Sequence, residues 1–137
     1  MTARMSVSMT LDAVRERRKT VTRRHVDSWR NLHVGDRLLL IEKGQGLKRG
    51  EHQVVVAEVV VTAVDVIPLW PVGPGEILAE GLLAEARAAV GLGGGGEVPS
   101  KVSTWFCRFW LKGHGYPPDR DPATVQCRRI AWRYVDA

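Results

Sequence analysis

A lysine and a threonine stand three residues apart inside the most basic stretch of the chain. Lys19 and Thr22 belong to residues 15–25, which read R-E-R-R-K-T-V-T-R-R-H. In a partly dry cleft among arginines, desolvation and like charge lower the pKa of a lysine, and its neutral amine can act as a base. The Thr22 hydroxyl would be activated or would bind a substrate. The two side chains converge only if the backbone turns between them, because residues three apart in an extended chain face opposite sides.

Acid–base chemistry also needs a carboxyl group, and Glu80 is the most suggestive candidate. It precedes Gly81, which interrupts an apolar pattern of helical spacing, so its carboxylate can point out of the helix. Glu76, one turn earlier, is the weaker candidate. A surface acid near Arg87 is the competing interpretation of Glu80, and it is the more common fate of a helical glutamate.

The positive charge of the chain is concentrated in one region. The 137 residues carry a net charge of +5, and residues 15–30 hold seven Lys/Arg against two Asp/Glu, which equals the whole excess. A localised patch indicates an anionic partner, although a solvated helix end is the alternative. Arginine forks suit phosphate groups, and a GC-rich genome would give the same arginine bias. The expected phosphate-binding residues are Arg18, Arg23, Arg24, Arg128 and Arg129.

At most one aromatic residue is expected to line a cleft, where a base could stack on it. Trp29 and Trp105 are the likelier candidates, and the spacing of the others is typical of a core. Cys107 and Cys127 form neither a zinc pattern nor a disulfide framework, which predicts buried thiols in a reducing compartment. The four histidines are scattered, so we expect no metal site and no cofactor.

The organisation of the chain predicts one domain over residues 1–137. The N-terminus has no apolar signal-peptide region and the apolar runs are too short to span a membrane, so we expect a cytoplasmic protein without membrane contact. Its oligomeric state is expected to be a monomer or a weak dimer.

Hydrophobic periodicity predicts an α+β fold around a small curved or closed sheet. The valine-rich strand at 53–67 looks buried on both faces and bent at Glu58. In the last strand, the change of parity between Cys127 and Ile130 predicts a β-bulge near Arg128–Arg129. The other expected elements are a leader or edge strand at 1–7, a helix from Thr10 to about Arg18, extended residues after it, a turn at 32–36 with a permissive Gly35, a strand at 37–41, a helix at 76–90 interrupted at Gly81, a helix opening at Pro99, and loops at 44–51 and 91–99.

Several short motifs, taken in order, resemble the ASCH family over about residues 8–135. They are R-R-K-T-V-T-R-R, Trp29, V-G-D-R-L-L, G-L-K-R-G-E, V-x-V-T-A-V, the E-G pair at 80–81, F-x-x-F-W and R-I-x-W-x-Y. The resemblance implies a PUA-like fold, in which a small β-barrel of about five or six strands is flanked by three helices with a cleft between them. It also implies an association with RNA or modified bases.

The activities known in the ASCH family include cleavage of single-stranded RNA and removal of the acetyl group from N4-acetylcytidine. In the second branch a Lys, a Thr and a Glu do the chemistry, and by motif these fall on Lys19, Thr22 and Glu80. Lys19 would activate Thr22 or a water, Glu80 would protonate the leaving amine or orient the attacking group, and Arg23 and Arg24 would hold phosphate or the oxyanion.

This chain departs from the compact amidohydrolases of the family. It adds a segment at 86–101 and a W-F-C-R-F-W helix, which can reshape the cleft, and it is more similar to the longer ASCH proteins of phage and bacterial genomes. The favoured expectation is therefore binding of single-stranded RNA or a modified nucleobase in a basic cleft, with ribonuclease-type hydrolysis as an added activity. Deacylation of N4-acetylcytidine by Lys19, Thr22 and Glu80 is the alternative, and a non-catalytic protein-interaction module is the third.

Overall fold

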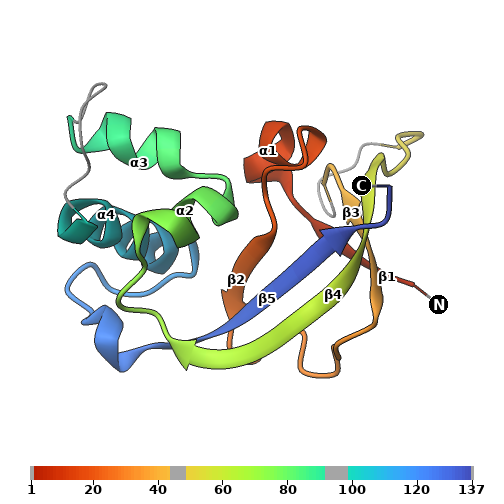
Figure 1. Cartoon of the computed structure of the whole chain (residues 1–137). Helices are drawn as coiled ribbons and strands as arrows, with labels where there is room; N and C mark the ends of the chain where they lie inside the picture. Colours follow the sequence, from red (N-terminus) through yellow and green to blue (C-terminus); the bar gives the residue numbers. More distant parts are fainter. Residues whose placement is uncertain (1, 44–48, 92–98, 137) are drawn as a thin grey trace.

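A five-stranded sheet and four α-helices make up the protein, as seen in a computed structural model that describes residues 2–43, 49–91 and 99–136 (Figure 1). This is the predicted α+β class. The strands are β1 (Ala3–Ser6), β2 (Val21–His25), β3 (Arg37–Ile41), β4 (Val55–Pro68) and β5 (Gln126–Tyr134), and the helices are α1 (Leu11–Arg15), α2 (Pro74–Glu80), α3 (Leu83–Ala89) and α4 (Pro99–Gly113), with 3-10 turns η1 (Ser8–Thr10) and η2 (Pro122–Thr124).

The sheet curls into a half-barrel because its longest strand is bent. The strand order is β1-β3-β4-β5-β2, with β1 parallel to β3 and the other neighbours antiparallel. Along β4 the pairing with β5 shifts at Thr62, and the pairing with β3 shifts between Ala57 and Val55. These irregularities bend the strand on either side of Glu58, the residue at which the sequence predicted the bend. Only one face of β4 is deeply buried, through Ala57, Val59 and Val61.

The predicted bulge at Arg128–Arg129 is wrong. From Cys127 to Ile130, β5 pairs without interruption with both β2 and β4. The change of parity has another cause, because this strand serves two cores. Cys127 packs among the helices, and Ile130, on the opposite face, packs inside the half-barrel.

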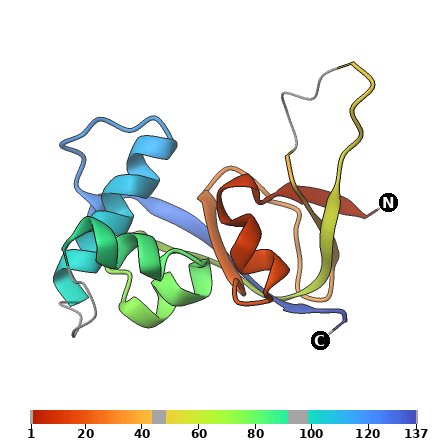
Figure 2. The same cartoon turned by 90° about the horizontal axis from the view of Figure 1, so that it is seen from above.

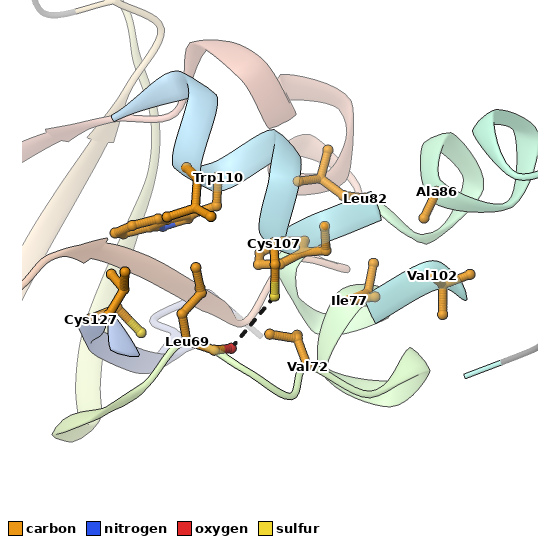
Figure 3. Packing of buried hydrophobic residues seen from close by; sticks show 12 residues of the cluster. Leu69, Val72, Ile77, Leu82, Ala86, Val102, Cys107, Trp110 and Cys127 are labelled. Carbon is orange, nitrogen blue, oxygen red and sulfur yellow. Dashed lines mark hydrogen bonds between the residues drawn. The ribbon is translucent and has the colours of Figure 1, made fainter. Parts of the chain in front are cut away.

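The first core lies between the sheet and the helices α2, α3 and α4, which gather where β4 ends and β5 begins (Figures 1 and 2). The helix α4 turns an apolar stripe towards it that contains Val102 and Trp110 (Figure 3). Phe106 belongs to the same stripe. The two cysteines are free and buried here, as predicted. Cys107 donates to the Leu69 carbonyl over 3.8 Å, and burial raises the pKa of each thiol to about 11.

The helices differ from the sequence-based expectation at two points. The interruption at Gly81 is a full break, because Gly81 has φ = +85° and separates α2 from α3, so four helices flank the sheet instead of three. The first helix ends at Arg15, short of the predicted Arg18, and Arg17 has a left-handed backbone (φ = +62°).

The predicted edge strand at 1–7 is present as β1, and Gly35 has the expected permissive conformation (φ = +92°). The predicted loops at 44–51 and 91–99 fall mainly outside the described residues. In the described part of the chain, no helix combines the length and the apolar character that crossing a membrane requires.

The half-barrel is open between its two edge strands, and a side chain crosses the opening. β1 and β2 are the edges of the sheet. Arg24 of β2 donates to the main-chain carbonyl of Ser6 in β1 over 2.7 Å. This bond places the Arg24 guanidinium at the seam.

Candidate functional site

Lys19 lies in a turn that joins α1 to β2. Its carbonyl accepts hydrogen bonds from the Trp132 indole over 3.0 Å and from the Tyr134 hydroxyl, both on β5. Its amide donates to the carbonyl of Ala13, and the amide of Thr20 donates to Ala79 in α2. The backbone therefore turns at Lys19, which is the condition that the sequence set for Lys19 and Thr22 to share one side.

Glu80 is the last residue of α2, and it meets Lys19 with both its main chain and its side chain. The Lys19 ammonium donates to the Glu80 carbonyl over 2.7 Å and lies 3.6 Å from a carboxylate oxygen. Gly81 makes this approach possible, since a Cβ there would stand 2.7 Å from the Cβ of Ala13 and 3.5 Å from that of Lys19. A helix C-terminus attracts cations, so Lys19 also acts as a cap for α2.

A chain of alternating charges continues from this pair towards the sheet. Arg23 donates to the Glu80 carboxylate over 2.8 Å and to Glu76 over 2.7 Å. Arg129 donates to both oxygens of Glu76, over 2.6 and 3.1 Å. Exposure is 3% for Lys19 and for Glu80 and 5% for Arg23, so the inner part of this chain of charges is almost dry.

Burial and charge shift the protonation of these groups in different directions. Burial lowers the pKa of Lys19, the Glu80 carboxylate opposes the shift, and Arg24 and Arg23 add to it. Arg129 and Arg23 hold the pKa of Glu76 at about 2, against an opposing effect of partial burial. Lys19 is thus a buried amine whose ammonium form is disfavoured, as proton transfer near neutral pH requires.

Lys19, Thr22 and Glu80 all line one cavity of about 630 Å³, together with Arg23 and Arg24. The predicted trio is therefore brought together, and Glu80 is a buried acid instead of the surface acid of the competing interpretation. Within the described residues the Thr22 hydroxyl has no hydrogen-bond partner, although the residue is only 5% exposed. A hydroxyl in that position is available to a bound molecule.

Two further segments line the cavity. One is mainly apolar and comes largely from α4, with Leu82, Phe106, Phe109 and Trp110, followed by Lys112, Gly113 and His114 at and just beyond the end of the helix. The other is formed by residues 6–10, at the end of β1 and in η1. Trp110 donates through its indole nitrogen to the carbonyl of Arg23 over 2.9 Å, which ties α4 to β2. The apolar spacing of α4 was interpreted as core, and the same spacing predicts that one edge of the stripe can face a cavity.

Neither of the two aromatic candidates for the cleft, Trp29 and Trp105, lines this cavity. Trp29 packs on the half-barrel core, and Trp105 stacks on Phe109 at a centroid distance of 5.2 Å and lines a separate depression of about 370 Å³. Trp110 and Phe109 are the aromatic residues that line the cavity, in the role that was expected of Trp29 or Trp105. Sequence spacing could not separate Trp105 from Trp110, because both lie on the partly apolar half of α4.

The expected phosphate-binding arginines have different fates. Arg24 lines the cavity and binds a carbonyl, and Arg23 and Arg129 are paired with carboxylates. Arg128 donates to the carbonyl of Val26 over 2.8 Å. Arg18 pairs with Glu16 over 2.6 Å and lines another groove, of about 600 Å³, between α1 and α3.

The described residues contain no group of three or more His, Cys, Asp or Glu side chains that could hold a metal ion. The chemistry that the cavity can support on its own residues is proton transfer by Lys19, hydroxyl chemistry at Thr22, and stabilisation of negative charge by Arg24.

The comparisons with known proteins show a similar fold and indicate no activity. No protein-family model matches the chain, and no curated protein matches it. Among solved structures it is similar to a crystal structure of a protein from Enterococcus faecalis V583 assigned to the DUF984 family, with a TM-score of 0.59 and 15% identity over 98% of this chain and 81% of the other. At this identity the likeness concerns the architecture alone.

Proposed function

We propose that this chain is an ASCH-type amidohydrolase that removes an acyl group from the exocyclic amine of a modified cytosine. The observation that carries the proposal is the meeting of Lys19, Thr22 and Glu80 on one cavity of about 630 Å³. A cavity of this volume is within the range of small-molecule sites and suits a single nucleoside. The aromatic side chains of Phe109 and Trp110 give such a base apolar surfaces to contact.

The reaction is hydrolysis of an amide. Neutral Lys19 accepts a proton from a water or from the Thr22 hydroxyl, and the resulting nucleophile attacks the acyl carbonyl carbon. The carbon–nitrogen bond breaks, and the Lys19 ammonium returns the proton to the departing exocyclic nitrogen. When Thr22 is the attacking group, a water then cleaves the acyl–threonine ester. The products are the unmodified amine and a carboxylate.

In this scheme Glu80 positions Lys19 and stabilises its ammonium form. The Glu80 carboxylate is held by Arg23 over 2.8 Å, and both its carbonyl and its carboxylate contact Lys19. This geometry favours the orienting role over the proton-donating role that the sequence also allowed. The side chain of Arg24, which among the described residues donates only to the carbonyl of Ser6, keeps donors for an anionic group of the substrate.

Binding of single-stranded RNA is the second candidate, and the pairing of the arginines limits it. Most of the basic stretch is neutralised by acids, as in the pairs Arg15–Glu42, Arg17–Asp136, Arg18–Glu16 and Arg23–Glu80. Arg24 and Lys112 line the cavity, and neither forms an ion pair with the described carboxylates. They favour contact with one or two phosphates near the cavity over a long strand lying on the patch.

The test is to incubate the protein with N4-acetylcytidine and, separately, with a short single-stranded RNA, and to follow the products by mass. We expect release of cytidine and acetate, with turnover lost in Lys19→Met and Thr22→Val and retained in Lys101→Ala, an exposed lysine on the same helix as the cavity wall. Absence of cytidine would contradict the amidohydrolase, and full activity of Thr22→Val would remove Thr22 from its mechanism. RNA cleavage without deacylation would favour the second candidate.

A further inference from the structure

We propose that the cavity contains an anion subsite formed by Arg24, Lys112 and His114, and that this subsite binds the phosphate of a nucleotide substrate. The inference rests on the proposed function and narrows its substrate from nucleosides to phosphorylated nucleosides. All three residues line the same cavity as Lys19 and Thr22.

Arg24 is placed to reach a group that lies beyond the base. It follows Thr22 by two residues on β2, so the two side chains share a face of the strand about 7 Å apart. Arg23, between them, faces α2 and is neutralised by Glu76 and Glu80. Along β2, the reactive Thr22 is therefore followed by Arg23, which is paired with carboxylates, and then by Arg24, whose side chain is bound only to a carbonyl.

The Arg24 guanidinium is anchored and still has donors to offer. One terminal nitrogen donates to the carbonyl of Ser6 over 2.7 Å, which fixes the side chain at the seam between β1 and β2. A carbonyl leaves the charge of the arginine uncompensated, whereas a carboxylate would cancel it. Burial lowers the pKa of Arg24, which expresses the cost of a charge held away from water, and the Glu80 carboxylate, which is bound to Arg23, opposes this shift only in part. A bound anion would remove that cost.

Lys112 and His114, at and just beyond the C-terminal end of α4, line the same cavity as Arg24. Lys112 is exposed and makes no ion pair in the described structure. The ring of His114 stacks on Trp110 at 3.8 Å, and its Nδ1 lies 2.7 Å from the carbonyl of Trp110. Nδ1 therefore carries the hydrogen and donates it, so Nε2 is the nitrogen that remains for a ligand.

The charges around His114 already resist its protonation. Burial is the largest effect and lowers the pKa of His114, the Trp110 carbonyl opposes the shift, and the neighbouring Arg24 and His25 lower the pKa further. A phosphate dianion stabilises the positive charges of Arg24 and Lys112 and favours protonation of His114 at Nε2, since it accepts several charge-assisted hydrogen bonds at once. A carboxylate or a neutral ribose hydroxyl would satisfy fewer of these donors.

The experiment compares the binding of cytidine, cytidine 5′-monophosphate and a trinucleotide with a central cytidine, by calorimetry at low salt. We expect the monophosphate or the trinucleotide to bind at least about tenfold more tightly than cytidine, since each charge-assisted hydrogen bond contributes on this scale. A preference for the monophosphate assigns the subsite to a terminal phosphate, and a preference for the trinucleotide assigns it to a phosphodiester. Equal affinities for all three would overturn the subsite.

Two variants and one spectroscopic signal make the test specific. Lys112→Ala and Arg24→Lys should reduce the preference for phosphate, and the exposed control Lys101→Ala should keep it. Titration of the histidine ring signals by NMR should show that cytidine 5′-monophosphate raises the pKa of His114, and the ring signals of His33, which does not line the cavity, should not respond to the ligand. An unmoved His114 pKa would contradict the subsite even if the variants fold poorly.

The outcomes for the subsite and for the hydrolase can be told apart. Deacylation of N4-acetylcytidine that is unaffected by a 5′-phosphate would leave the hydrolase and remove the subsite. Phosphate-dependent binding without any deacylation would leave the subsite and remove the hydrolase.

Discussion

The Lys19 ammonium and Glu80 are joined twice, through the Glu80 carbonyl at 2.7 Å and through its carboxylate at 3.6 Å. One residue comes from the turn before β2 and the other ends α2, so the same contact connects the sheet to the helices and forms the centre of the candidate site. Replacements here will change stability and activity together, and the predictions below are designed to separate the two.

Glu80→Gln should destabilise the protein more than Lys19→Met. The glutamine leaves buried Lys19 without its carboxylate and leaves Arg23 with a single carboxylate, that of Glu76, at a cost of about 3–5 kcal/mol. The methionine removes one cation and leaves Glu80 bound to Arg23, so its cost should be smaller. Urea unfolding of both variants measures the difference. If Lys19→Met proved the more costly change, the assignment of Glu80 as the shared anion would be wrong.

Thr22→Val should separate catalysis from folding. Because the Thr22 hydroxyl has no partner within the described residues, its replacement by a methyl group should change the free energy of unfolding by less than about 1 kcal/mol. The same change should lower kcat/KM for deacylation by about 100-fold or more. Thr22→Ser is the matched control and should retain a large part of the rate. Equal rates for the valine and serine variants would remove Thr22 from the mechanism.

Glu76 should contribute to stability in a defined pH range. Its pKa is depressed from 4.5 to about 2 by Arg129 and Arg23, so the folded state favours the carboxylate. This contribution is fully present above pH 4.5 and is lost as the pH falls towards 2. The difference in unfolding free energy between the wild type and Glu76→Gln should therefore shrink over this range. The control Asp119→Asn, at an exposed acid outside the ion pairs, should show no such trend.

Gly81→Ala should cost more than Gly35→Ala, although both glycines have positive φ, +85° and +92°. Both changes carry the left-handed penalty of about 1–2 kcal/mol. At Gly81 the new Cβ would also stand 2.7 Å from that of Ala13, whereas nothing lies within 4 Å at Gly35. Thermal unfolding should show an extra loss of about 1–3 kcal/mol at Gly81. Equal losses would mean that α1 and α2 can separate without cost.

The parts of the structure that sequence could predict are those set by local pattern. The strand at Arg37–Ile41, the long β4 and the break at Gly81 all follow from periodicity and glycine chemistry. The parity of β5 misled the prediction, because a strand that crosses from one core to another changes its buried face without any bulge.

The candidate site was predictable in its centre and not at its periphery. Lys19, Thr22 and Glu80 were indicated by residue type and by the family resemblance, and they line one cavity. The neutralisation of the arginines was not predictable, since Arg17 finds Asp136 across nearly the whole chain and Arg129 finds Glu76. Such ion pairs between distant residues depend on how the sheet curls, and the local sequence pattern does not determine that curvature.

The two sides of the cavity differ in how much they contribute to the stability of the fold, and this difference affects how relatives of this chain can diverge. On one side of the cavity, the buried ion pairs of Glu80 with Lys19 and Arg23 also connect the helices to the sheet, so a substitution there destabilises the fold. Phe109, Lys112 and His114, at the outer end of α4, also line the cavity and form no ion pair with the described residues of the sheet. New substrate preferences can therefore arise on that helix end at little structural cost, and the reaction centre would be inherited unchanged.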